Sequence, residues 1–94
     1  MPTDDAYAEK EVTIVNVQGL HARPVMRFVD LASQFASSIR VKKGDLDVDG
    51  KSPMEMMLLE AVQGTLLKLV AKGADAGAAV EALAGLVDNK FGEI

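Results

Sequence analysis

One short stretch of the chain, GLHARP at residues 19–24, contains the residue types best suited to covalent chemistry in this sequence. It holds the only histidine, His21, followed by Arg23 and Pro24. A neutral imidazole presents one ring nitrogen with a free lone pair, which can act as a nucleophile. A guanidinium nearby can hold an anion through charge-assisted hydrogen bonds. The stretch therefore predicts a site that takes up an anionic group such as phosphoryl.

The place of His21 in the chain supports this interpretation. A β-branched run at residues 11–17 predicts a strand, and apolar residues recurring every three or four positions predict an amphipathic helix over residues 22–36. His21 then lies where that helix begins, with Pro24 tolerated in its first turn. Unpaired N–H groups and the helix dipole favour an anion there and disfavour an imidazolium. We expect His21 to be neutral near pH 7, with a phosphoryl group held by helix N–H groups and Arg23.

The remaining elements follow from periodicity and turn residues. The predicted order is β-α-β-β-α-β-α, an α+β fold whose two long helices cover one face of a four-stranded antiparallel sheet. After the first helix we expect a hairpin over residues 38–50 that turns at Lys43 and Gly44. A short helix follows, with Ser52 as N-cap, Pro53 in its first position and Glu55 completing a capping box. The last two elements are a strand over residues 65–72 and a helix that begins at Asp75.

Length and composition restrict the class of protein. Ninety-four residues make one domain, and we expect a loose acidic leader at residues 1–8 and a single domain at residues 9–94. The chain has no cysteine and a net charge of −4, which argues against disulfides, thiolate metal sites and nucleic-acid partners. It has neither a long apolar run nor a secretory signal, so we expect no membrane partner and a cytoplasmic location.

Two other kinds of site are considered and set aside. Asp45, Asp47 and Asp49 match the first half of an EF-hand calcium loop, but the twelfth position is Met56 and the preceding residues alternate like a strand. An acidic chain with a serine at a helix start also suggests an acyl carrier protein, but Ser52 lies in Lys-Ser-Pro where that class has Asp-Ser-Leu. We expect no metal site.

With GLHARP at a strand-to-helix turn, VDGKS at residues 48–52 and this element order, the chain resembles HPr, the histidine-containing phosphocarrier of the bacterial phosphoenolpyruvate-dependent sugar phosphotransferase system. The resemblance covers roughly residues 9–92 and implies an open-faced β-sandwich. It implies that His21 takes a phosphoryl group from enzyme I and passes it to enzyme IIA domains, with Arg23 beside it. Gly19, Ala22 and Pro24 would shape the phosphate-site turn. The resemblance implies no cofactor and no catalysis by the chain itself, which we expect to be a monomer.

Ser52 has two compatible interpretations. Its position predicts an N-cap worth on the order of 1 kcal/mol. In many HPr proteins the matching serine is also phosphorylated by a dedicated kinase, HPr kinase/phosphorylase, so the resemblance implies a regulatory site. Pro53 and Glu55 depart from the family pattern after this serine, and Glu55 places a carboxylate near any added phosphate. Regulation at Ser52 therefore stays open.

Methionines near the predicted site suggest a surface for partners. Met26, Met54 and Met57 would lie around His21 in such a fold, and flexible thioethers suit a surface that docks on several proteins in turn. Core filling is the alternative for Met54 and Met57, and it is our expectation for Met56, Leu58 and Leu59.

Two other functions use the same fold: a regulator of carbon or nitrogen control that binds partners according to phosphorylation state, and an interaction module with an inert histidine.

Overall fold

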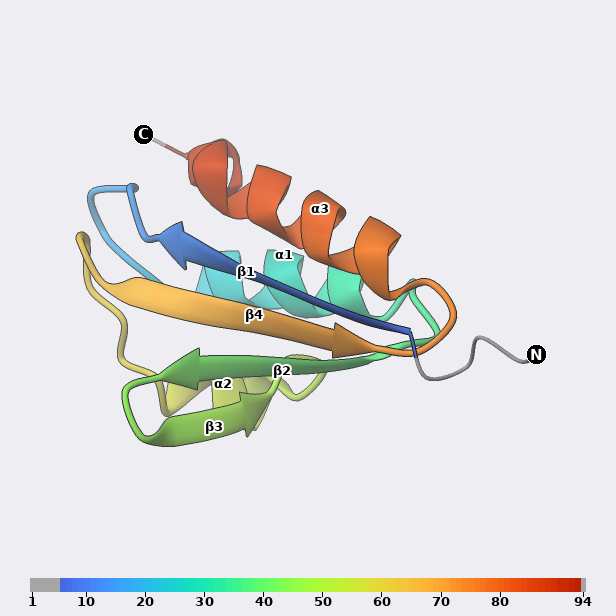
Figure 1. Cartoon of the computed structure of the whole chain (residues 1–94). Coiled ribbons are helices and arrows are strands. Elements are labelled where there is room, and N and C mark those ends of the chain that lie inside the picture. Colours follow the sequence, from blue (N-terminus) through green and yellow to red (C-terminus); the bar gives the residue numbers. More distant parts are fainter. Residues whose placement is uncertain (1–5, 94) are drawn as a thin grey trace.

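The computed structural model describes residues 6–93 and confirms the predicted α+β fold. Three helices lie on one face of a four-stranded sheet, and the other face is open (Figure 1). The elements follow the expected order: β1 (Tyr7–Thr13), α1 (Ala22–Ala32), β2 (Ser38–Lys43), β3 (Leu46–Asp49), α2 (Pro53–Met57), β4 (Leu66–Lys72), α3 (Ala76–Asp88) and a short terminal turn (Lys90–Gly92).

The sheet is antiparallel throughout, with strand order β1-β4-β2-β3. β4 lies inside the sheet and pairs with both β1 and β2, so the last strand in sequence joins the first to the hairpin. Leu67, Leu69 and Ala71 are buried on the covered face and alternate with Lys68, Val70 and Lys72, of which Val70 is buried as well.

The two long helices bury apolar faces against this sheet. The α1 face contains Pro24, Val25, Phe28, Val29 and Ala32, and the α3 face contains Ala76, Ala79, Val80, Leu83, Ala84 and Val87. Alanines on α3 allow its backbone to approach the sheet closely, while Phe28 of α1 fills space in the shared core. Burial of each large apolar side chain stabilises the fold by about 1.5–3 kcal/mol.

The first strand begins earlier than predicted. β1 runs from Tyr7 to Thr13, so it starts inside the segment expected to be a loose leader and ends before the predicted 11–17 strand does. The backbone ladder with β4, from the Tyr7–Lys72 pair to the Thr13–Leu66 pair, defines the strand although its first residues are polar. The remainder of the expected leader, residues 1–5, lies outside the described residues.

The first helix is shorter than predicted because another segment captures its final amides. α1 ends at Ala32 and not at residue 36. The Asp75 carboxylate accepts hydrogen bonds from the Ala36 N–H at 2.8 Å and the Ser37 N–H at 2.9 Å, and also from the Ser37 hydroxyl. Gly73 packs here as well, since an added Cβ would lie 2.7 Å from the Ser37 Cα atom. These contacts tie the end of the α1 segment to the start of α3.

We expect Asp75→Asn to lower the urea midpoint at pH 7, because an amide cannot accept all three hydrogen bonds. The bonds from the Ser37 hydroxyl and the Ala36 N–H hold the pKa of Asp75 below its usual value of 3.8. Their stabilisation is therefore fully present above the pKa of the unfolded chain and is lost as pH falls through the lower folded value. The gap in urea midpoint between wild type and variant should narrow as pH falls below about 3.8 and close once pH is below the lower folded pKa.

Asp30→Asn is the control, since Asp30 is exposed on α1 and has no side-chain hydrogen bond within residues 6–93. It should leave the urea midpoint near that of wild type at both pH values. A gap for Asp75→Asn that is the same at neutral and acidic pH would contradict the assignment.

Candidate functional site

The candidate site begins with a turn held between two neighbouring loops. The Leu20 N–H donates to the Ala61 carbonyl at 2.8 Å, and the Gly64 N–H donates to the Ile14 carbonyl at 2.7 Å. Gly19 has φ +70°, and an added Cβ there would lie 2.6 Å from the Ala61 oxygen. Glycine is therefore required both by backbone conformation and by space. The turn fixes where α1 begins.

His21 is the N-cap residue of α1, as the sequence predicts. Its backbone is extended, with φ −90° and ψ −169°, and its carbonyl accepts the first helical bond from the Val25 N–H at 3.0 Å. Ala22 and Arg23 are exposed in the first turn, where Pro24 is buried. The His21 side chain makes no capping bond and is 38% exposed. The ring is therefore reachable by a partner and lies beside the helix N-terminus.

A carboxylate that the sequence analysis missed lies against this ring. The Glu93 Oε1 atom is 3.1 Å from the His21 Nε2 atom. The same oxygen accepts a hydrogen bond of 3.3 Å from the Nδ2 group of Asn16, which is fully buried. Within the described residues the Nδ1 atom of His21 has no hydrogen-bond partner. Neutral histidine carries one ring proton, so a bond from Nε2–H to Glu93 leaves the Nδ1 lone pair free.

Glu93 reaches the ring because the chain reverses after α3. Lys90, Phe91 and Gly92 have φ values of 59°, 55° and 77°, all in the left-handed region. For the two non-glycine residues this conformation costs roughly 1–2 kcal/mol each. Full burial of the Phe91 ring stabilises the turn by about 1.5–3 kcal/mol, which offsets most of this strain. The Arg27 Nη1 group also donates to the Phe91 carbonyl at 3.0 Å, which fastens the turn to α1.

An open pocket of about 540 Å³ lies against this arrangement, and both His21 and Glu93 line it. Its lining includes two arginines and one carboxylate, which give it a positive balance, and the helix N-terminus adds to this balance. Such a pocket suits an anion held briefly beside a nucleophilic ring nitrogen. The lining residues are Val17, Gln18, His21, Arg23, Arg27, Gly92 and Glu93.

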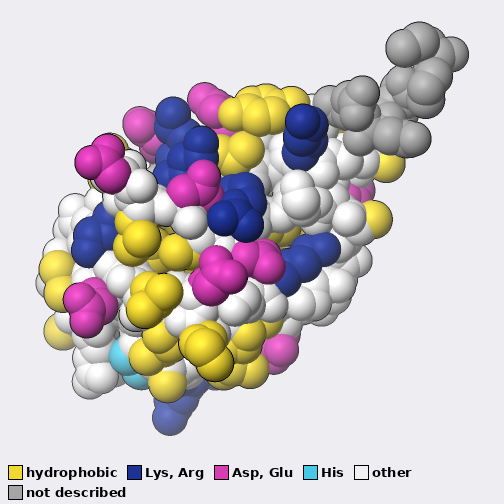
Figure 2. Space-filling model, turned by 90° about the horizontal axis from the view of Figure 1, so that it is seen from below, with side chains coloured by type: hydrophobic (Ala, Val, Ile, Leu, Met, Phe, Trp, Pro, Cys, Tyr) yellow, Lys and Arg dark blue, Asp and Glu magenta, His cyan; other side chains and the backbone are white. Residues whose placement is uncertain are grey.

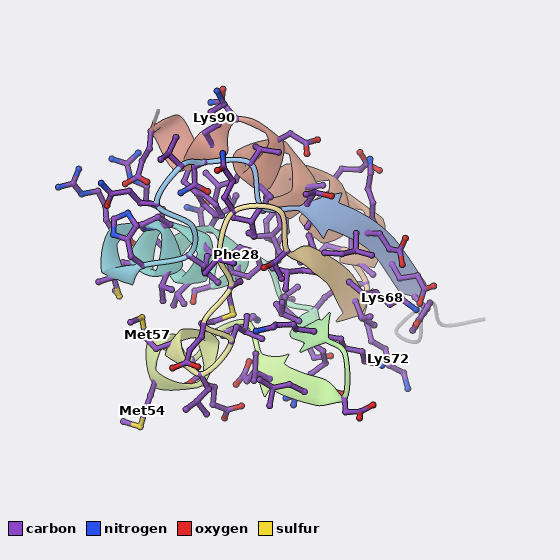
Figure 3. All side chains as sticks on the ribbon, turned by 90° about the vertical axis from the view of Figure 1, so that its left-hand side faces the viewer. Phe28, Met54, Met57, Lys68, Lys72 and Lys90 are labelled. Atoms are coloured by element: carbon purple, nitrogen blue, oxygen red, sulfur yellow. The ribbon has the colours of Figure 1, made fainter. Side chains whose placement is uncertain are left out.

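Three methionines named by the sequence analysis are exposed. Met54 is 80% exposed, Met26 46% and Met57 45%. Met54 and Met57 project from α2 toward solvent (Figure 3). Hydrophobic side chains gather next to the cyan histidine in Figure 2, so an apolar surface adjoins the candidate site.

The expectation that Met56, Leu58 and Leu59 fill the core is wrong for Leu58. Met56 and Leu59 are buried, but Leu58 is 61% exposed. The reason is that α2 ends at Met57, and Leu58, its C-cap, projects outward. Leu58 therefore enlarges the exposed apolar surface that Met54 and Met57 form, here called the α2 patch (Met54, Met57 and Leu58).

Ser52 is the N-cap of α2, as predicted. Its Oγ atom accepts a hydrogen bond of 3.2 Å from the Glu55 N–H. The capping box is only half formed, because the Glu55 carboxylate accepts from the Asp49 N–H at 2.9 Å and not from Ser52. Phosphate on Ser52 would replace the cap and meet the Glu55 and Asp49 carboxylates. Modification of Ser52 stays a prediction.

The acidic hairpin residues are engaged locally. The Asp47 carboxylate accepts from the Arg40 Nε group at 2.9 Å, and the Asp49 carboxylate accepts from the Lys51 N–H at 2.9 Å. Across residues 6–93, His, Cys, Asp and Glu side chains form no group of three that could hold a metal ion. In the same range, no helix is long and apolar enough to cross a membrane.

Comparisons with known proteins agree on one family. A family model described as the PTS HPr component phosphorylation site matches residues 8–89. Phosphocarrier protein HPr of Neisseria meningitidis serogroup A is 44% identical over 85 residues, covering 90% of this chain and 96% of that protein. Phosphocarrier protein NPr of Shewanella violacea is 40% identical over 85 residues, covering 90% and 93%. The crystal structure of HPr-C-His from Thermoanaerobacter tengcongensis has a TM-score of 0.89 and 45% identity, covering 93% and 98%.

We expect Gly19→Ala to destabilise the protein more than Gly44→Ala. Both glycines have positive φ, so each substitution costs roughly 1–2 kcal/mol in backbone strain. Only at Gly19 does the added Cβ collide with backbone, whereas at Gly44 it meets nothing within 4 Å. Overpacking should add roughly 1–3 kcal/mol for Gly19→Ala. Urea denaturation measures both, and equal losses would show that the two loops do not constrain the turn.

Proposed function

Because this chain belongs to the HPr family of phosphocarrier proteins, we propose that His21 accepts a phosphoryl group from phosphorylated enzyme I and passes it to an enzyme IIA-type acceptor. The observation that carries the proposal is the His21 ring at the start of α1, 38% exposed, with no hydrogen-bond partner at Nδ1 within the described residues and in a pocket that Arg23 also lines. The chain is thus a substrate that other proteins phosphorylate and dephosphorylate. It acts in the cytoplasm as a monomer and needs no cofactor.

The proposed step uses groups already in place. The Nδ1 lone pair of His21 attacks phosphorus, an N–P bond forms, and the bond from phosphorus to the donor breaks with its electron pair leaving on the donor. The Nε2 proton stays on the ring and faces Glu93. The Arg23 guanidinium and the free N–H groups of the first helical turn offset the phosphoryl charge. Transfer to the acceptor reverses these changes.

Partner docking is proposed for the exposed apolar side chains beside the ring. Met26 on α1 and the α2 patch are exposed and are not needed for the core, and hydrophobic side chains gather next to the histidine in Figure 2. Flexible thioethers adapt to more than one partner surface, as a carrier that meets a donor and then an acceptor requires. A transient contact of this kind buries a small area and releases quickly.

A regulatory role is the second candidate, and the similarity to NPr of Shewanella violacea favours it. The chemistry at His21 would be the same, and only the partners would differ. The two roles are separated by comparing how fast His21 is phosphorylated by the enzyme I of a sugar branch and by the enzyme I of a nitrogen branch. Phosphorylation of Ser52 by HPr kinase/phosphorylase would add a second means of regulation. The negative charge of the nearby Glu55 carboxylate disfavours that phosphorylation.

We expect incubation with enzyme I and phosphoenolpyruvate to add one phosphoryl group to wild type and to Ser52→Ala, but none to His21→Ala. A histidine phosphoramidate hydrolyses in acid, whereas a phosphoserine persists. Intact mass before and after acid treatment therefore identifies the site. Acid-labile phosphate on His21→Ala would refute the assignment, and so would a wild-type protein that stays unmodified with enzyme I of either branch.

We expect Met54→Gln to slow phosphoryl acceptance by about three- to tenfold, because an exposed apolar contact to the donor is lost. Its stability should be unchanged, since Met54 is 80% exposed. Tyr7→Gln is the matched control, because Tyr7 is 58% exposed at the start of β1, the opposite end of the sheet from the site. Initial rates at subsaturating carrier measure the effect. Equal slowing by both variants would exclude the α2 patch as the docking surface.

A further inference from the structure

We infer that Glu93, held by Asn16, is a positioning residue that fixes the His21 ring with its proton on Nε2 and its lone pair on Nδ1. The inference rests on the proposed function, which supplies the reaction at Nδ1, but the arrangement of the ring can be tested without that reaction. It assigns a role to the C-terminal segment, which follows the last helix and belongs to none of the elements that shape the His21 turn.

Asn16 orients the Glu93 carboxylate. Its Nδ2 group donates to the Gly19 carbonyl at 2.7 Å and to Glu93 Oε1 at 3.3 Å. Both partners are acceptors, so the opposite orientation of the amide would place its oxygen against two oxygens. The NH₂ group must therefore face them. Because Asn16 is fully buried, the carboxylate is joined to the turn that carries His21 by a side chain with little freedom.

The terminal turn brings Glu93 to this position from the other side. The buried Phe91 ring anchors the segment, and Arg27 on α1 holds the Phe91 carbonyl. The Glu93 N–H donates to the Lys90 carbonyl at 2.8 Å, which closes the turn directly before the carboxylate. With its side chain only 16% exposed, Glu93 is fixed by its own backbone as well as by Asn16.

The position of the ring proton follows from one oxygen atom of Glu93, which accepts from both Asn16 and His21. Asn16 Nδ2 and His21 Nε2 both point at Glu93 Oε1, which can accept two hydrogen bonds. Holding the ring proton on Nε2 keeps the Nδ1 lone pair free and the ring plane fixed. Once a phosphoryl group is on Nδ1, Nε2 remains the protonated nitrogen and the same carboxylate still accepts from it. Glu93 thus supports the ring before and after transfer without touching the phosphoryl group.

The test compares Glu93→Gln, Glu93→Ala and the control Glu81→Ala. Glu81 is a 73% exposed residue of α3 paired with Lys10 at 3.5 Å, so its removal changes net charge equally without reaching the ring. Long-range ¹H–¹⁵N spectra of the ¹⁵N-histidine protein, recorded where the ring is neutral, report which nitrogen carries the proton. Initial rates of phosphoryl acceptance report the effect on the reaction.

Wild type, Glu93→Gln and Glu81→Ala should show a single Nε2–H form, because glutamine keeps an acceptor oxygen. Glu93→Ala should show a mixture of the two ring forms and accept phosphoryl about fivefold more slowly, the effect of losing one hydrogen bond. Glu93→Gln should stay within about twofold of wild type.

An unchanged ring spectrum in Glu93→Ala would overturn the inference, and so would an equal change in Glu81→Ala. If wild type accepts phosphoryl while no Glu93 variant alters the ring, the positioning role fails and the proposed function stands. If the ring form changes as expected but wild type is never phosphorylated, the proposed function fails and the positioning role stands.

Discussion

Two loops from distant parts of the sequence meet where Gly19 packs against the Ala61 carbonyl, and the placement of His21 depends on this contact. The backbone bonds from Leu20 to Ala61 and from Gly64 to Ile14 hold the loops together at the end of the sheet. A side chain at Gly19 would push them apart and move the first turn of α1 with them. The ring can be exposed and still well placed because these hydrogen bonds and the close packing at Gly19 constrain the backbone beneath it.

The electrostatics of the site come from opposing contributions. The N-terminus of α1 and the Arg23 and Arg27 side chains favour an anion, whereas Glu93 opposes one. An arrangement with the cations alone would hold phosphate strongly and release it slowly. In the proposed arrangement, the Glu93 carboxylate at Nε2 would limit that affinity while it supports the ring. A carrier that must both accept and donate the same group needs such a balance, because tight binding of one state would slow the other half of the cycle.

The sequence revealed the parts of this site that depend on local rules. A histidine before Ala-Arg-Pro is recognisable as a helix start, and Ser52 before a proline is recognisable as a cap. Glu93 could not be found in this way, because its position depends on left-handed residues stabilised by burial of Phe91, a contact with the core. The start of β1 at Tyr7 could not be predicted for the same reason, because its first residues form a strand only through their backbone pairing with β4.

If the α2 patch is the docking surface, as proposed, the choice of partner lies outside the His21 turn. HPr and NPr relatives match this chain over nearly the same length, so the fold and the turn do not by themselves separate their roles. What can vary without disturbing the chemistry is the exposed α2 patch, since Met54, Met57 and Leu58 contribute little to the core. Helix α2 is short and ends at Met57, so Leu58 projects outward and joins Met54 and Met57 as an exposed apolar side chain. With His21 as the proposed reactive residue and the α2 patch as the proposed docking surface, one carrier could exchange partners while the ring keeps the same geometry.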